Sequence, residues 1–158
     1  MKTVKSKPIL YARKPAMELE YYSEIINAVY SDLFPLKWTT NYDYEIGFYE
    51  RNKKLQTEIF FGIWFATWKQ YEIPLCLAVN HWGEHQTQVY QKLEKDIKSK
   101  SIEGIIIKYF DDHFVLLLDE NYFNHKTDVD RISDLFIALS NLLGLGEALE
   151  EYLKMKQN

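Results

Sequence analysis

The residues whose types and spacing best suit chemistry are His81, Glu84 and His85, which lie within five consecutive positions. On a helix, two imidazoles four residues apart share one face, because the helix repeats every 3.6 residues. Imidazole nitrogens bind zinc, and a neighbouring carboxylate can act as a general base toward zinc-bound water. The spacing therefore makes His81 and His85 candidate metal ligands and Glu84 a candidate catalytic residue.

This five-residue string resembles the H-x-x-E-H motif of the inverted zinc peptidases, and the resemblance implies a metal-dependent hydrolase. Those enzymes have a much larger catalytic domain, and Gly83 interrupts the motif here. His81 and His85 also continue the four-residue spacing of Val89 and Leu93, which is typical of rings packed between a helix and a sheet. We therefore expect no metal and no cofactor, and a metal-dependent hydrolase is the second alternative function.

Cys76 is the only cysteine and lies in the apolar run 73–79. Burial in such a run raises the pKa of a thiol, which favours a core position over a nucleophile. A metal site made of Cys76, His81 and His85 needs a fourth ligand. One cysteine excludes a disulfide within the chain, and no apolar run approaches the ~20 residues that cross a bilayer. We therefore expect a cytoplasmic protein without membrane association.

Helical spacing of apolar residues, at intervals of three and four, recurs in three segments. They are residues 16–33, 84–100 and 128–143. A shorter fourth helix, with Leu149 and Leu153 on one face, is predicted to close the chain.

Five other segments have the alternation or composition of strands. They are residues 42–50, 57–68, 73–79, 102–110 and 114–118, with turns at 51–54 and 111–113. Residues 57–68 are apolar on both faces, which indicates a central strand, although a short helix could begin at Ala66. This order predicts an α+β fold with a mainly antiparallel five-stranded sheet and helices packed on it, in the order α-β-β-β-α-β-β-α-α.

The length fits one domain over residues 16–158, preceded by a basic arm over residues 1–15. Residues 1–17 contain five basic and no acidic residues, whereas the rest of the chain contains 14 basic and 23 acidic residues. A short charged terminus of this kind is expected to be flexible, and its charge suits phosphate groups or an acidic partner.

The order helix, three strands, helix, strand over about residues 16–110 resembles the core of the PD-(D/E)xK nucleases. This resemblance implies a magnesium site with an Asp on the second core strand and an (Asp/Glu)-x-Lys on the third. Here the second strand offers Glu58 at its start, the third has no acid, and Glu50 and Lys53 have the wrong spacing. A nuclease-like scaffold with an incomplete catalytic set, acting on foreign DNA in a bacterium or phage, is the first alternative.

Aromatic residues make up 16% of the chain, and Tyr and Trp dominate the residues that contribute most to protein interfaces. The candidate binding residues are Tyr42, Tyr44, Tyr49, Arg51, Lys53, Lys54, Trp68 and Trp82. Their mixture of rings and basic groups also suits nucleic acid, because bases stack on rings while lysines contact phosphates. The net charge of -4 favours a protein partner. We therefore expect a non-enzymatic binding or regulatory protein that recognises another protein or a second copy of itself.

Overall fold

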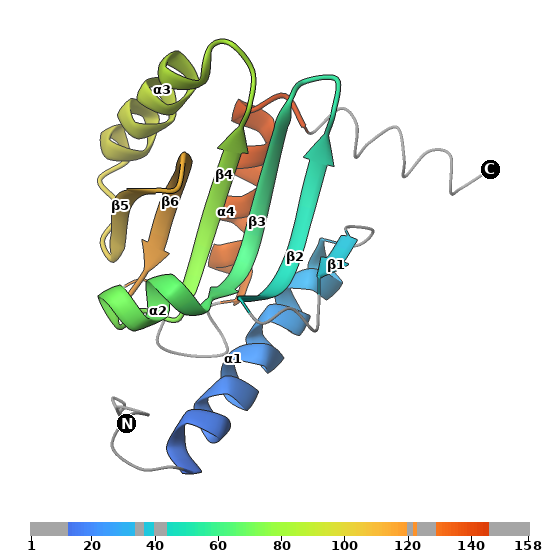
Figure 1. Ribbon diagram of the computed structural model, residues 1–158, viewed down its shortest axis with the longest axis vertical. Coiled ribbons are helices and arrows are strands. Elements are labelled where there is room, and N and C mark those ends of the chain that lie inside the picture. The colour runs from blue at the N-terminus through green and yellow to red at the C-terminus, as the bar shows by residue number, and fades with distance from the viewer. Residues whose placement is uncertain (1–12, 34–36, 40–43, 120–121, 123–128, 146–158) are drawn as a thin grey trace, which may run out of the picture.

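The computed structural model describes residues 13–33, 37–39, 44–119, 122 and 129–145 of the chain (Figure 1). The elements are α1 (Arg13–Asp32), β1 (Lys37–Thr39), β2 (Glu45–Asn52), β3 (Thr57–Trp64), α2 (Phe65–Tyr71), β4 (Leu75–His81), α3 (Gln86–Ser99), β5 (Ile105–Phe110), β6 (His113–Leu118) and α4 (Val129–Leu142). The predicted α+β class is confirmed.

The strands form one sheet in the order β1-β2-β3-β4-β6-β5, and every neighbouring pair is antiparallel. Five of these strands are the predicted ones. The sixth, β1, pairs its three residues with residues 47–49 in the middle of β2, and three residues are too few to show an alternation of apolar and polar side chains. The two-residue turn Asp111-Asp112 has positive φ at both positions, as the tight turn between β5 and β6 requires.

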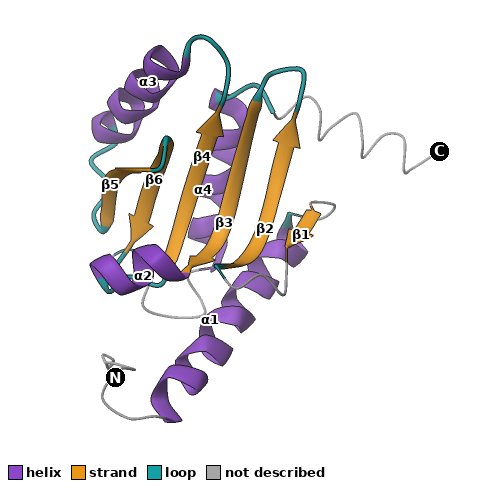
Figure 2. Cartoon of the chain, viewed as in Figure 1, coloured by secondary structure: helices purple, strands orange, loops and turns teal. Residues whose placement is uncertain are grey.

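Helices α1 and α4 cover one face of the sheet, and α3 lies against the β5–β6 end (Figure 2). Each helix packs through one apolar stripe, which is why the three-and-four spacing located it. The core between helices and sheet includes Ile26 and Val29 of α1, Phe48 of β2, and Ile132 and Phe136 of α4, all 2% exposed or less. We call this side of the sheet the core face.

Several element boundaries differ from the predicted ones. Strand β2 continues to Asn52, so Arg51 lies in the ladder opposite Glu58 and not in a turn. Strand β3 ends at Trp64. The short helix that the sequence allowed as an alternative from Ala66 is present and begins one residue earlier, at Phe65. Helix α1 begins at Arg13, inside the predicted arm, while the rest of that arm and the predicted helix around Leu149 lie outside the described residues.

Among the described residues, no helix combines the length and the apolar character needed to cross a membrane.

Candidate binding surface

The second face of the sheet carries the side chains that alternate with those of the core face. Strand pairing assigns the following residues to it: Tyr49, Arg51, Glu58, Phe60, Trp64, Cys76, Ala78, Asn80, Ile106, Lys108, Phe110, His113, Val115 and Leu117. Of the described helices, only α2 lies on this side, across one end of the strands (Figure 1). We call this surface the open face.

Small and branched residues form the floor of the open face. Cys76, Ala78, Val115 and Leu117 are 1% exposed or less, although the described helices leave most of this face uncovered. Larger side chains around them provide the cover: Tyr49, Phe60, Trp64, Tyr71, Ile73 and Phe110. The open face is therefore a second apolar cluster whose outer layer is aromatic.

Trp64 is the centre of that aromatic layer. Its ring stacks on Phe60 with centroids 5.7 Å apart and planes at 25°, and it meets the His113 ring edge-on at 5.0 Å. The Phe110 ring lies on the same face, with its centroid 6.3 Å from that of Trp64. The Trp64 indole nitrogen is buried and has no hydrogen-bond partner among the described residues. An unsatisfied buried donor costs free energy.

Two glycines facing each other on β2 and β3 make room for Phe60. A Cβ added to Gly47 would lie 2.8 Å from Phe60 Cζ, and one added to Gly62 would lie 2.9 Å from the same atom. Both would also lie within 2.9 Å of backbone atoms on the neighbouring strand. The Phe60 ring therefore lies flat over backbone, which gives Trp64 a surface on which to stack.

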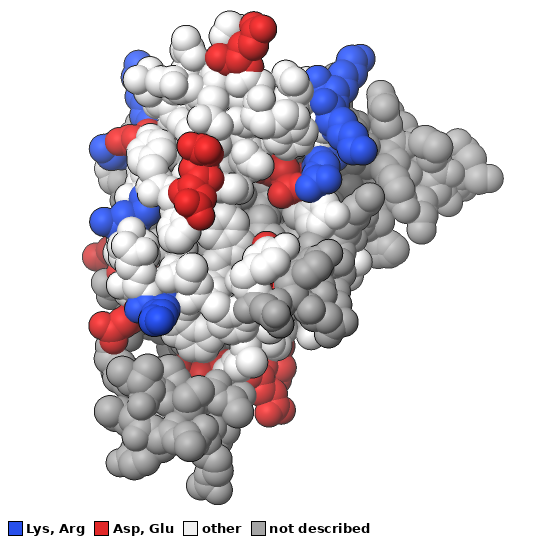
Figure 3. Space-filling model, viewed as in Figure 1, with Lys and Arg blue, Asp and Glu red and all other residues white. Residues whose placement is uncertain are grey.

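Charged side chains border the open face. The Arg51 guanidinium lies 5.3 Å from the centre of the Tyr49 ring, and its Nε donates to Glu58 Oε1 at 2.6 Å. This hydrogen bond raises the pKa of Arg51. At the opposite edge of the sheet, Lys108 Nζ lies 5.3 Å from the centre of the Tyr71 ring. Figure 3 shows one group of Lys and Arg near the β2–β3 turn, other basic side chains along the opposite edge, and acidic side chains between them on an otherwise uncharged surface.

Five of the eight predicted binding residues lie at the end of the sheet that carries the β2–β3 turn. Tyr49 and Arg51 lie together on the open face, and Lys53 and Lys54 are exposed in the adjoining β2–β3 turn. Trp82, 42% exposed, lies at the same end, where its backbone N–H donates to the Gln56 carbonyl at 3.0 Å.

The remaining predicted residues lie elsewhere. Tyr44 is 61% exposed just before β2, and Tyr42 lies outside the described residues. Trp68 contacts Tyr22 of α1 at 6.0 Å between ring centroids, so it packs toward the core and not beside Tyr49.

His81, Glu84 and His85 do not share a helix. His81 is the last residue of β4, paired with Thr57, and α3 begins only after His85. The backbone N–H of His81 donates to the Tyr90 hydroxyl at 2.9 Å. Burial and the nearby His85 lower the pKa of His81. The shared helical face that the H-x-x-E-H motif requires is therefore absent, because strand pairing extends through His81.

No three His, Cys, Asp or Glu residues gather at a possible metal position in the part of the chain that the structure describes. Cys76 points to the open face while His81 lies on the core-face register, so β4 separates them. Burial raises the pKa of the Cys76 thiol to about 12. The thiol is therefore protonated at neutral pH, and its environment is not that of a nucleophile.

The two carboxylates considered for a nuclease site lie on opposite faces of the sheet. Glu58 is on the open face with Arg51, whereas Glu50 is 8% exposed on the core face and accepts a hydrogen bond from Ser140 Oγ at 2.8 Å. Burial raises the pKa of Glu50, and the Ser140 hydrogen bond opposes this in part. Opposite faces of a strand do not converge on one magnesium ion, so this pair forms no catalytic set.

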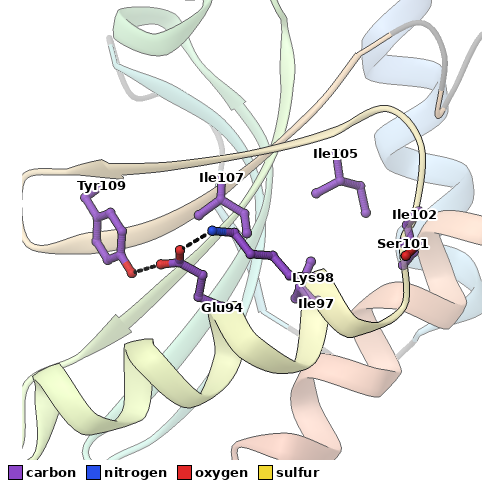
Figure 4. A pocket seen from close by; sticks show the side chains of 8 residues that line it. All are labelled: Glu94, Ile97, Lys98, Ser101, Ile102, Ile105, Ile107 and Tyr109. Carbon is purple, nitrogen blue, oxygen red and sulfur yellow. Dashed lines mark hydrogen bonds and ion pairs between the residues drawn. The ribbon is translucent and has the colours of Figure 1, made fainter.

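A separate depression of about 400 Å³ lies between α3 and the edge strand β5 (Figure 4). Its lining is Glu94, Ile97, Lys98, Ser101, Ile102, Ile105, Ile107 and Tyr109. At one end of it, the Glu94 carboxylate accepts from the Tyr109 hydroxyl at 2.6 Å and pairs with Lys98 Nζ at 2.7 Å. Burial and this hydrogen bond raise the pKa of Tyr109 to about 12.

The predicted binding residues did not include the central members of the open face, which are Phe60, Trp64, Phe110 and His113. A usable signal was present in the small residues Gly62, Cys76 and Ala78, which occupy alternate positions on two adjacent central strands. Small residues on one face of a central sheet leave room that large neighbours fill.

Comparison with known proteins finds no matching family model, no matching curated protein and no matching solved structure.

Proposed function

We propose that this protein is a non-enzymatic binding protein that recognises another protein through the open face of its sheet. The observation that carries the proposal is the aromatic layer around Trp64, which no described helix other than α2 approaches. Helices cover the equivalent layer on the core face. An aromatic surface with an uncharged centre and a charged border has the composition of a protein interface.

The details of the surface support this proposal. Tyr49, Trp64 and Phe110 are half-buried, so part of each ring already packs against the floor and little rotamer freedom is lost on binding. Arg51 is held over Tyr49 by Glu58, which places a guanidinium at the border in a fixed position.

Affinity purification from the cells that produce the protein tests this proposal, with the recovered proteins quantified by mass spectrometry. Tyr49→Ala should reduce recovery of the specific partner by about tenfold or more, because aromatic residues at interface centres often contribute about 2 kcal/mol. The control is Ile137→Ala on α4, where the side chain is 42% exposed on the other side of the sheet. Equal recovery with both variants, each shown to be folded by circular dichroism, would contradict the proposal.

Nucleic-acid binding is the second candidate, favoured by the basic groups near the β2–β3 turn. Lys53 and Lys54 are exposed there, next to the Arg51–Tyr49 pair. Replacing both lysines by alanine should then lower the slope of log affinity against log salt by about 2 for a single-stranded oligonucleotide. A salt-independent affinity, or none, would leave the protein-binding proposal as the only one with a supporting surface.

A further inference from the structure

A second surface lies at the β5 edge of the sheet, next to the aromatic layer to which Phe110 at the end of β5 belongs. Strand β5 is the last in the order, and among the described strands it pairs with β6 alone. It has six residues, contains no proline, and carries Ile106 and Tyr109 at 37% and 54% exposure. An edge strand of this length presents unpaired backbone groups to which another extended chain can pair.

The turn that joins β5 to β6 determines which backbone groups face outward. Because Asp111-Asp112 is a two-residue turn, Phe110 and His113 are the pair that exchange hydrogen bonds next to it. Alternation along the strand then directs the N–H and C=O groups of Ile105, Ile107 and Tyr109 away from β6.

The depression beside β5 lies where a further strand would place half of its side chains. Figure 4 shows Ile105, Ile107 and Tyr109 extending from β5 toward α3, with Ile97 and Lys98 on the facing side. Its volume of about 400 Å³ accommodates two aliphatic side chains. A strand added to β5 would alternate, with every second side chain entering this depression, where Ile97, Ile105 and Ile107 provide apolar contacts.

Lys108 indicates the charge of the side chains that the added strand would place on the open-face side. It lies on the open-face side of β5, contacts the Tyr71 ring, and has no carboxylate partner among the described residues. Directly opposed residues on paired strands have Cβ atoms about 5 Å apart, so a carboxylate there would meet the ammonium group.

A second copy of this chain does not meet that requirement. Antiparallel pairing of two β5 strands about a twofold axis keeps the two faces of the sheet matched only in alternate registers. In the two such registers that pair most of β5, Lys108 lies opposite Ile106 or opposite itself. Neither supplies a carboxylate, and the second opposes like charges.

We propose that β5 binds an extended segment of a partner protein by strand addition, with apolar side chains in the depression beside α3 and acidic side chains facing Lys108. Strand addition obtains affinity from backbone hydrogen bonds and specificity from pockets for alternate side chains. This inference does not rest on the open-face proposal, because it requires only the outward backbone groups of β5, Lys108 and the depression beside α3, and two strands separate β5 from β3, which carries Trp64.

Two synthetic hexapeptides with blocked ends test the inference: one alternates valine and glutamate, and the other alternates valine and lysine. The wild-type protein should bind the acidic peptide about fivefold more tightly, the size of one surface ion pair. Backbone NMR shifts should concentrate at Ile105, Ile107 and Tyr109. Methylating the peptide amides that face β5 should abolish binding, and methylating the alternate amides should not.

A variant that reverses the preference between the two peptides distinguishes a specific site from a damaged fold, because a damaged fold would lose binding to both peptides. Lys108→Glu should prefer the basic peptide, whereas Lys92→Glu at an exposed position of α3 should keep the wild-type preference. Equal affinity for both peptides, no shifts at about 1 mM peptide, or shifts centred on Trp64 would each overturn the inference. A protein dimer that pairs through β5 would also overturn it. Tyr49→Ala should not change peptide binding, so either proposal can fail while the other holds.

Discussion

The Trp64 indole stands perpendicular to the His113 imidazole, at 87° with centroids 5.0 Å apart, although β4 separates their strands. The contact exists because Cys76 and Ala78 on β4 are small enough for a ring to extend across them. Rings on both sides thus join three strands into one surface.

That contact predicts a measurable coupling between two substitutions. Trp64→Leu and His113→Ala should each destabilise the fold, and their double mutant should lose about 1 kcal/mol less than the two effects added together. Urea unfolding of the four proteins measures the coupling. Strict additivity would show that the edge-on contact contributes nothing to stability.

The facing glycines should tolerate no side chain. Gly47→Ala places a Cβ 2.2 Å from the Phe61 carbonyl oxygen, which is backbone and cannot rotate away. We expect a loss of about 3 kcal/mol, at the upper end for an added methyl group in a packed region. The control is Ala66→Gly in α2, an ordinary helical substitution that should cost about 1 kcal/mol of stability. Gly144→Ala cannot serve as the control, because Gly144 has a φ of +78° that strains any other residue. Equal losses for the two would contradict the close approach.

Glu50 should make stability rise as the pH falls toward 4.5. Burial raises its pKa in the folded protein, so the folded state binds a proton more tightly than the unfolded state, where the pKa is near 4.5. Between those two pKa values, stability decreases as the pH increases. Glu50→Gln keeps an oxygen acceptor for Ser140 and should be the more stable protein at neutral pH, with an advantage that shrinks on acidification. An advantage that does not change from pH 8 to pH 5 would contradict the account.

The rate at which the Cys76 thiol reacts should measure how often the aromatic layer of the open face moves away from the floor. Its sulfur is fully buried and its thiol pKa is raised to about 12, so a disulfide reagent at pH 8 should not react with the folded protein at an appreciable rate. Trp64→Ala removes the ring above the floor and should accelerate the reaction more than it accelerates global unfolding. If labelling followed global unfolding in both proteins, Trp64 would not cover Cys76.

The fold class was predictable because each element carries its own pattern. The apolar stripes of α1 and α4 and the alternation of β2 depend only on neighbours in sequence. The helix–strand boundary after Trp64 was less accessible, because residues 57–68 are apolar throughout. That boundary decides the site: it leaves Trp64 on the open face and directs Trp68 toward α1.

The binding surface was predictable only in part for a related reason. Tyr49 lies on the predicted strand 42–50, but Arg51 was predicted in the turn after it, so the face that the two residues share follows only from the continuation of β2 to Asn52. Trp64, Phe110 and His113 meet through the pairing of β3, β4, β6 and β5, which no local pattern encodes. The His81 string failed in the opposite direction, since its short-range spacing suggested a helix that strand pairing with Thr57 prevents.

Site-specific photo-cross-linking tests the central claim most directly. A photoreactive phenylalanine analogue would replace Tyr49 or Phe110 on the open face, and Asp134 on α4 as the control on the opposite side of the sheet. The account predicts a discrete cross-linked protein from both open-face positions and none from α4. Cross-links from α4 alone, or equally from all three positions, would contradict recognition through the open face.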